Sequence, residues 1–408
     1  MNDRLYCFYD LAVSPCSYDF FQFLVLCEQQ RIRDGFGEIE IIFIAGPNKG
    51  YREDNIRTFE QNDQMFRNVL LPGCQLLPSI KATRFESDRR RIIINDLPTD
   101  SIFPLGYSVN QPIPDYMYNG IVASHFIGEK PVRFVAPDYA LNSIESYLKN
   151  NNFHEKKLLT LTPRELKRED ESGLRSINHK AWENFFKGLD QDQWQPIIIR
   201  DTSATFSNKP LFSDIPEIDL ASHHLHLRCA IYQKAFLNFC KANGPLMLQL
   251  FSPKSMVMFL ELDNDVIALS ESWYKTNLGM SVGSQFPLTE KNKIVFWGKE
   301  SAEIISEMVG LASNVAENNP SGTHDYFNVQ NLAYVADTSF RYALSKITFD
   351  IRHEHLKVFY LRDNLINKKI LDGKLSLDII TDLEGKSLPI GMRKEVIKNY
   401  EKFGIPIV

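Results

Sequence analysis

The sequence has no long hydrophobic run. None of its segments approaches the 18 or more consecutive apolar residues that a membrane-spanning helix needs. The opening residues, Met-Asn-Asp-Arg, lead into a strand-like stretch and not into the apolar segment of a signal peptide. We therefore expect a cytoplasmic protein, and these features leave peripheral membrane association open.

The sequence also lacks the spacings of metal and redox sites. Its six cysteines include no Cys-x-x-Cys pair, and no Cys/His spacing resembles a zinc site. Most of the cysteines lie in apolar segments, which favours free thiols in a reducing compartment. His223, His224 and His226 cluster, but on a helix this spacing places them on different faces. We therefore expect no metal site.

Positive charge is not in excess. The net charge is -5, whereas proteins that bind nucleic acid usually present a basic face to the polyanionic backbone. The run Arg89, Arg90, Arg91 is surrounded by acidic residues, and we interpret it as solvated surface. No nucleic-acid partner is expected.

Three common enzyme signatures are missing. The sequence contains no Walker A loop, no Rossmann glycine triplet after a strand and no Gly-x-Ser-x-Gly elbow. Their absence argues against kinase, dehydrogenase and α/β-hydrolase activities.

What the sequence does contain is an alternation of apolar strand-like runs and helical patterns. Its 408 residues, 44% of them hydrophobic, suffice for two or three domains. The pattern predicts strands at 5–11, 38–45, 91–95, 158–161, 196–200, 256–262 and 294–297. It predicts helices from residue 18 and over 56–80, 138–150, 222–235, 245–251 and 301–311, with Asp138 as a helix cap; the segment 236–240 fits either a strand or a continued helix.

This alternation is typical of α/β proteins with parallel sheets. We expect two Rossmann-like α/β domains facing a cleft, the first over residues 1–131 and the second over 132–316. A mainly helical extension over 317–408 follows, with helical patterns at 333–347 and 393–403.

In open α/β sheets, ligands gather at the carboxyl ends of the strands. Arg164 and Glu165 follow the predicted strand 158–161, and Arg175 precedes the next helix. An arginine at such a place can donate a bidentate pair of hydrogen bonds to a phosphate. The alternative is an ion pair between Arg164 and a neighbouring glutamate.

Asp201 and Thr202 follow the strand that ends in Arg200. Residues of these types at a strand end either cap the next turn through local hydrogen bonds or line a pocket for a nucleotide base or ribose. Both interpretations stay open for this pair.

The segment Asn243, Gly244, Pro245 is the third candidate. Glycine permits a close approach to the backbone, and proline suits the first position of a helix. A helix starting at Pro245 would direct free N–H groups at a diphosphate. The alternative is a plain connecting turn.

In the first domain, the loops over 10–17 and 46–52 correspond to these segments. Asp10 or Asp19 is a candidate general base that would deprotonate an acceptor hydroxyl. Asp19 is also explained as a first-turn residue that the helix dipole favours.

The order of elements over 158–262 resembles the donor-binding half of a GT-B glycosyltransferase, especially bacterial surface-polysaccharide enzymes of the heptosyltransferase-like kind. In that family a Gly-Pro turn opens a helix that holds the donor diphosphate, and Asn243, Gly244 and Pro245 match it. Ala242 and Asn243 stand where the family has Asp-Thr. Arg164 matches the place of a phosphate-binding basic residue, and the loop from Asp10 to Asp19 matches the acceptor-side loop.

The resemblance implies a metal-independent glycosyltransferase without a cofactor. Its donor would be a nucleotide-diphosphate sugar and its acceptor a glycan or another acceptor. The resemblance makes residues 1–131 the acceptor-side domain and residues 132–316 the nucleotide-sugar-binding domain. The same fold also occurs in sugar-nucleotide epimerases, and a non-catalytic carbohydrate-assembly protein is a third possibility.

Overall fold

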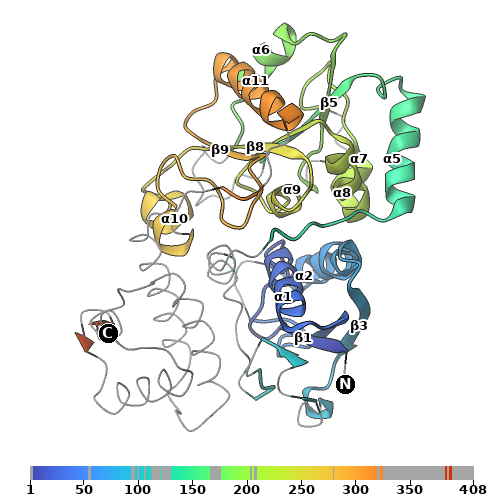
Figure 1. The fold of residues 1–408 in the computed structure, drawn as a ribbon, viewed down its shortest axis with the longest axis vertical. Helices are drawn as coiled ribbons and strands as arrows, with labels where there is room; N and C mark the ends of the chain where they lie inside the picture. The colour runs from blue at the N-terminus through green and yellow to red at the C-terminus, as the bar shows by residue number, and fades with distance from the viewer. Residues whose placement is uncertain are drawn as a thin grey trace.

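The computed structural model contains two α/β units that follow one another along the chain (Figure 1). It describes residues 3–324 without 54–56, 93–96, 99–100, 105–106, 111, 113–120, 122–129, 166–175, 203–204, 206–208, 279 and 319–321, together with 382–383 and 386–387. The helical patterns at 333–347 and 393–403 lie outside the described residues. The short strands β10 (Asp382–Leu383) and β11 (Lys386–Ser387) pair in an antiparallel manner.

The first unit is built on a parallel sheet of four strands in the order β3-β2-β1-β4. The strands are β1 (Arg4–Asp10), β2 (Glu38–Ile44), β3 (Ile80–Glu86) and β4 (Ile102–Phe103). Every residue of β2 after Glu38 is buried, as expected for a central strand that is covered on both faces. The predicted strands at 5–11 and 38–45 are confirmed.

The helices of this unit begin and end at local signals. The helix α1 (Phe20–Asp34) ends at Gly35, whose φ of 76° is the left-handed conformation of a helix C-cap. Thr58 and Gln61 form a reciprocal capping box at the start of α2 (Phe59–Met65). The chain then continues helically to η2, which confirms the helix predicted over 56–80; the turns are η1 (Phe66–Leu70), α3 (Leu71–Gly73) and η2 (Cys74–Leu76).

The third strand does not lie where the sequence predicts it. β3 covers Ile80–Glu86, and Arg89–Arg91 forms a 3-10 turn, η3, whose first turn is capped by the Asp88 carboxylate. β3 is an edge strand with mostly exposed or half-buried residues, so it lacks the apolar run that marks a buried strand. The prediction of a strand starting at residue 91 is therefore wrong, and residues 93–95 lie outside the described part of the chain.

The second unit is built on a parallel sheet of five strands in the order β6-β5-β7-β8-β9. The strands are β5 (Lys157–Thr162), β6 (Trp194–Ile198), β7 (Leu237–Lys241), β8 (Ser255–Leu260) and β9 (Lys293–Trp297). All predicted strands of this unit are confirmed, and the ambiguous segment 236–240 is a strand. Two units with parallel sheets confirm the predicted α/β fold class.

Helices cover both faces of this sheet. On one face α6 (His179–Gly188) and α11 (Ala302–Asn318) pack over β5, β7 and β8. On the other face lie α5 (Asp138–Asn150), α8 (Leu225–Lys234) and α9 (Leu246–Leu250). The remaining turns are α7 (Asp219–His223), η7 (Ile267–Leu269) and α10 (Glu271–Leu278), the last of which the sequence did not predict.

Two predicted helix boundaries need correction. The helix predicted over 222–235 is interrupted because His224 is extended, with φ -105° and ψ 107°, between α7 and α8. Asp138 is the first residue of α5 and does not cap it, because Pro137 occupies the capping position. Among the described helices, none has both the length and the apolar character needed to cross a membrane.

A buried aromatic seam joins the two units. Phe134, in the linker before α5, is fully buried, and its ring lies 5.3 Å from that of Phe21 in α1 and 5.9 Å from that of Phe251 after α9. The backbone of Phe134 donates to Phe251 O at 2.9 Å, and Val135 donates to Leu76 O at 2.8 Å. In Figure 1 the linker passes between the units, with α8 and α9 facing α1 and α2.

Phe134→Ala should lower the free energy of unfolding by about 3–5 kcal/mol, because it leaves a cavity between two rings in the seam. Val135→Ala is the matched control, since Val135 is 45% exposed and surface changes cost about 0.5 kcal/mol or less. Chemical denaturation of both variants measures the difference. Equally small losses of unfolding free energy in the two variants would show that the seam does not hold the units together.

A histidine also bridges the units. The His226 imidazole bonds through Nδ1 to the Tyr139 hydroxyl at 2.5 Å and through Nε2 to Pro72 O, in the first unit, at 2.7 Å. Burial lowers the pKa of His226, and the nearby His224 lowers it further. The neutral ring with a proton on Nε2 satisfies both contacts, because it donates to the carbonyl and accepts from the tyrosine.

A pH-dependent contribution to stability follows. The pKa of His226 is lower in the folded state than its ordinary value of about 6.5, so its contribution is present above pH 6.5 and is lost as the pH falls through the folded-state value. Between pH 7 and pH 5 the native chain should therefore lose more unfolding free energy than His226→Gln. Identical losses in denaturation series at both pH values would contradict this assignment.

Candidate functional site

The carboxyl ends of the two sheets meet at Tyr18 and Gly244. Tyr18 lies in the loop that follows β1, and Gly244 follows β7, the central strand of the second sheet. A Cβ atom on Gly244 would lie 2.6 Å from Cδ2 of Tyr18, so the aromatic ring rests directly on the glycine backbone. Burial raises the pKa of Tyr18, while the charge of Arg228 opposes this rise.

Asp10, at the end of β1, has a buried carboxylate that forms an ion pair with Arg89. Its two carboxylate oxygens accept from Nη1 and Nη2 of Arg89 at 2.7 and 2.8 Å. The Tyr107 hydroxyl donates to Oδ2 at 2.6 Å and the amide of Ala12 to Oδ1 at 3.0 Å. Because the carboxylate is buried and holds four donors, this geometry favours an anchoring role, and the prediction that Asp10 is a base remains untested.

Asp19 has a more open environment. It is half-buried at the start of α1, and its carboxylate accepts from the Ser17 hydroxyl at 2.7 Å. The structure gives no side-chain hydrogen bond from Asp19 to the first amides of α1, within the described residues. Asp19 occupies the N-cap position directly before the first turn of α1, so its interpretation as a residue that the helix dipole favours stays open.

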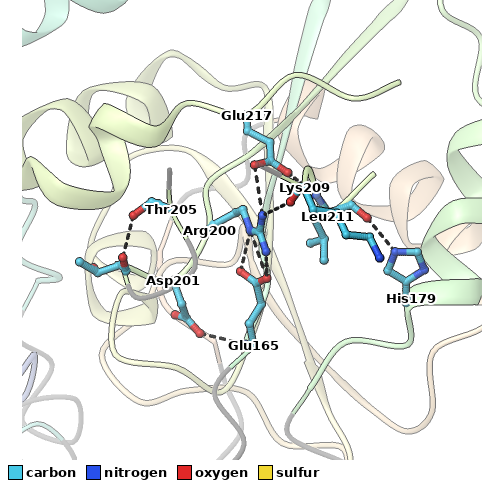
Figure 2. A network of polar contacts seen from close by, with 9 residues as sticks. Glu165, His179, Arg200, Asp201, Thr205, Lys209, Leu211 and Glu217 are labelled. Carbon is cyan, nitrogen blue, oxygen red and sulfur yellow. Dashed lines mark hydrogen bonds and ion pairs between the residues drawn. The ribbon is translucent and has the colours of Figure 1, made fainter. Parts of the chain in front are cut away.

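Two of the predicted donor-binding residues, Glu165 and Arg200, belong to one internal network. Figure 2 shows the Arg200 guanidinium between Glu165 and Glu217, with the carbonyl of Lys209 as a further acceptor. Nη2 of Arg200 lies 2.5 Å from Glu165 Oε1, and Nη1 lies 3.5 Å from Glu217 Oε2. Two carboxylates thus neutralise Arg200, so this arginine holds loops together and does not present an uncompensated charge to a phosphate.

Asp201 and Thr202 take part in the same strand-end structure. Asp201 Oδ2 accepts from the amide of Glu165 at 2.8 Å (Figure 2), and Thr202 donates to Ser222 O at 3.0 Å. Burial raises the pKa of Asp201, although the Glu165 amide and Arg228 act against the rise. Neither bond is the local turn cap that the sequence analysis offered, because the partners lie 36 and 20 residues away along the chain. Contact of Asp201 and Thr202 with a base or ribose stays a prediction.

The segment from Asn243 to Pro245 forms a tight turn into a helix of five residues, α9. The first amides of this helix are not free: Leu246 N bonds to Asn243 Oδ1 at 3.1 Å, and Leu248 N bonds to Pro245 O at 3.0 Å. The expectation of free N–H groups at this helix start therefore needs correction. Asn243 also donates to Thr162 O at 3.3 Å, which ties the ends of β5 and β7 together.

Arg164 lies at the carboxyl end of β5. It is half-buried, and its Nη1 donates to Ala242 O at 3.3 Å across the strand ends. It therefore stands beside the turn that carries Gly244. Arg175, the second predicted phosphate ligand, lies outside the described residues.

Arg228 is a residue of this edge that the sequence analysis missed. It comes from α8, is 1% exposed, and donates to the carbonyls of Ala221 and Arg200 at 3.0 and 2.9 Å. Tyr18, Tyr232 and Asp201 surround it closely enough to raise its pKa against the effect of burial. The only signal in the sequence is an arginine inside the otherwise apolar run Leu227-Arg228-Cys229-Ala230-Ile231.

A second buried ion pair lies at the end of β7. Lys241 Nζ is 3.6 Å from Glu300 Oε2, and both side chains are almost fully buried. Glu300 also accepts from the indole of Trp182 at 2.9 Å. This pair locks α6 and the segment before α11 to the strand end.

Metal ligands do not gather in the described part of the chain, where no group of three or more His, Cys, Asp and Glu side chains is placed to hold an ion. Two of the three neighbouring histidines have other hydrogen-bond partners: His226 bridges the units, and His223 bonds to Thr205. All six cysteines are buried thiols, and burial raises the pKa of Cys74 and Cys229 to about 12.

No family model and no curated protein matches the sequence. Among solved structures, the chain is similar to a family 9 glycosyl transferase from Veillonella parvula, at 8% identity over 75% of this chain and 89% of that one, with a TM-score of 0.45. It is also similar to the E. coli ADP-heptose lps heptosyltransferase II, at 8% identity over 77% of this chain and 99% of that one, with a TM-score of 0.43.

A putative UDP-N-acetylglucosamine 2-epimerase from Listeria monocytogenes matches at 8% identity over 83% of this chain and 94% of that one, with a TM-score of 0.32. These solved structures include the heptosyltransferase type that the sequence resembles. With TM-scores below 0.5 they do not decide a function, and the architecture stands on the parallel order of the two sheets and on their facing strand ends.

Gly244→Ala should destabilise the protein by about 1–3 kcal/mol, since the new methyl group overlaps the base of the Tyr18 ring. In a Tyr18→Ala background the same change should cost much less, because the overlapping atoms are gone. A double-mutant cycle by chemical denaturation measures this coupling. Simple additivity of the two changes would show that the ring does not rest on the glycine in solution.

Proposed function

We propose that the chain is a glycosyltransferase that moves a sugar from a nucleotide-diphosphate sugar to a glycan or other hydroxyl acceptor, without a metal cofactor. One observation carries the proposal: the carboxyl ends of β1 and β7, from different units, meet at Tyr18 and Gly244. Ligands of open α/β sheets bind at this edge. Two substrates can therefore approach each other there, one from each unit.

On the donor side, Arg164 is the residue best placed to meet a diphosphate. It is half-buried at the end of β5, beside the turn that carries Gly244. A guanidinium there would stabilise the negative charge that develops on the leaving diphosphate, and a partly dry site strengthens this effect. Asn243 shapes the same turn through its bonds to Thr162 and Leu246.

On the acceptor side, Asp19 is the better candidate for the general base. Its carboxylate is half-buried and accepts one hydrogen bond, from Ser17. The Asp10 carboxylate is by contrast held by Arg89 and Tyr107. A base must reach the acceptor hydroxyl at about 2.6–3.2 Å, and this favours the more accessible of the two.

A non-catalytic carbohydrate-assembly protein is the second candidate. It is favoured by the internal pairing of Arg200 with Glu165 and by the Tyr18 ring on Gly244, both of which use strand-end groups within the protein. Such a protein would turn over no nucleotide sugar.

The test is release of nucleoside diphosphate from a panel of nucleotide sugars with glycan acceptors, in the presence of a metal chelator. We expect acceptor-dependent release with one donor family. Arg164→Met should weaken donor use by about 10–100-fold, because hydrogen bonds to charged groups contribute about 1.5–3 kcal/mol. Arg33→Met, which removes an exposed arginine from the last turn of α1, is the control and should leave turnover unchanged.

Three other results are informative. Conversion of a nucleotide sugar without an acceptor would identify an epimerase. No turnover with any donor would favour the assembly protein, and equal activity of Arg164→Met and the native chain would remove the role proposed for Arg164.

Asp19→Asn should abolish most of the sugar transfer, while binding of the donor persists.

A further inference from the structure

Arg228 is a fully buried cation whose hydrogen-bonding capacity is incompletely used. Its Nε donates to Ala221 O at 3.0 Å, and its Nη2 donates to Arg200 O and Ser222 O at 2.9 and 3.2 Å. The third nitrogen, Nη1, is buried and has no hydrogen-bond partner in the described part of the chain. Leaving the N–H groups of a buried guanidinium without an acceptor costs free energy.

Among the residues that the structure describes, no carboxylate is in direct contact with the charge of Arg228 either. Three other cations at the strand ends, Arg89, Arg200 and Lys241, form ion pairs with Asp10, Glu165 and Glu300, respectively. In the described residues no such ion pair involves Arg228. Asp201, an acidic group that acts on Arg228 electrostatically, has one oxygen bonded to the Glu165 amide.

The surroundings of Arg228 include the ring that covers the strand ends. Tyr18 from the first unit and Tyr232 from α8 both act on the guanidinium electrostatically, and the Tyr232 hydroxyl also forms a side-chain hydrogen bond with it. Tyr18 also rests on Gly244, where a side chain larger than hydrogen would overlap it. The same tyrosine therefore lies against the turn that the donor phosphates are proposed to approach and is close enough to Arg228 to influence its charge.

We propose that Arg228 is the buried cation of an anion subsite at the carboxyl ends of β6 and β7, that a phosphate of a nucleoside diphosphate binds to its Nη1, and that the Tyr18 ring covers this subsite until the ligand displaces it. The identity of the ligand rests on the proposed function. The existence of the subsite rests on Nη1 of Arg228, which has no hydrogen-bond partner among the described residues, and on the position of the Tyr18 ring.

The geometry suits phosphate for two reasons. Three carbonyl oxygens hold the guanidinium in place, so little side-chain freedom is lost when an anion binds. The low polarity around a buried charge also strengthens its attraction for an oxyanion. Tyr18 lies in a loop and belongs to the other unit, so its side chain can rotate without disrupting either sheet.

The experiment is calorimetric titration with inorganic pyrophosphate and then with ADP and UDP. Tyr18→Ala should bind pyrophosphate at least about tenfold more tightly than the native chain, because no ring has to move. Tyr147→Ala, which removes a tyrosine ring from α5 outside the subsite, is the control and should match the native affinity. In the Tyr18→Ala background, Arg228→Lys should remove the gain.

A chemical probe covers the case in which the Arg228 variants do not fold. Phenylglyoxal modification followed by peptide mapping should label Arg228 slowly in the native chain and faster in Tyr18→Ala, and pyrophosphate should suppress the labelling. Unchanged pyrophosphate affinity in Tyr18→Ala, together with labelling that pyrophosphate does not suppress, would overturn the proposal.

The outcomes separate this proposal from the proposed function. Pyrophosphate binding that depends on Arg228, in a protein that turns over no nucleotide sugar, supports the subsite and contradicts the glycosyltransferase. Sugar transfer with donor affinities that are the same in the native chain, Tyr18→Ala and Arg228→Lys supports the glycosyltransferase and overturns the subsite.

Discussion

The burial of Phe134 between Phe21 and Phe251 is the contact on which the rest of the arrangement depends. Each ring belongs to a different part of the chain: the linker, the first unit and the second unit. Because all three are buried together, the apolar surface they remove from water fixes the two sheets relative to each other. The carboxyl end of β1 then faces that of β7, and the candidate site follows from this one constraint. Cleft closure by a large rotation of the units would have to break the seam, so movement at the site is more easily local, at side chains such as Tyr18.

Ion pairs organise the strand ends of the two sheets that the Phe134 contact fixes. Asp10 with Arg89, Glu165 with Arg200, and Glu300 with Lys241 are buried or half-buried pairs that join elements distant in sequence. Removing one partner of such a pair leaves an isolated charge in a poorly solvated place, which is strongly destabilising. These pairs therefore act as scaffold, and the ligand-binding roles are proposed for other residues at the same edge, namely Arg164, Asp19 and Arg228.

Much of the fold could be predicted from the sequence, because buried parallel strands are continuous apolar runs, as in β2 and β8. The edge strand β3 was missed since its exposed residues give no such run. The positions of the loops at the candidate site could be predicted for the same reason, but the roles of the residues in these loops could not. Whether Arg200 binds a phosphate or a glutamate depends on Glu165 and Glu217, which only the tertiary structure brings together. Arg228 was missed because its importance comes from burial beneath another unit's tyrosine, which no local pattern records.

The most direct test of this account is a crystal structure of the native chain with ADP or UDP that shows the positions of Tyr18 and Arg228. The account predicts the diphosphate at the carboxyl ends of β5 to β7, the Tyr18 ring turned away from Gly244, and a phosphate oxygen within about 3 Å of Nη1 of Arg228. A nucleotide bound at another place, with the Tyr18 ring still on Gly244, would contradict it.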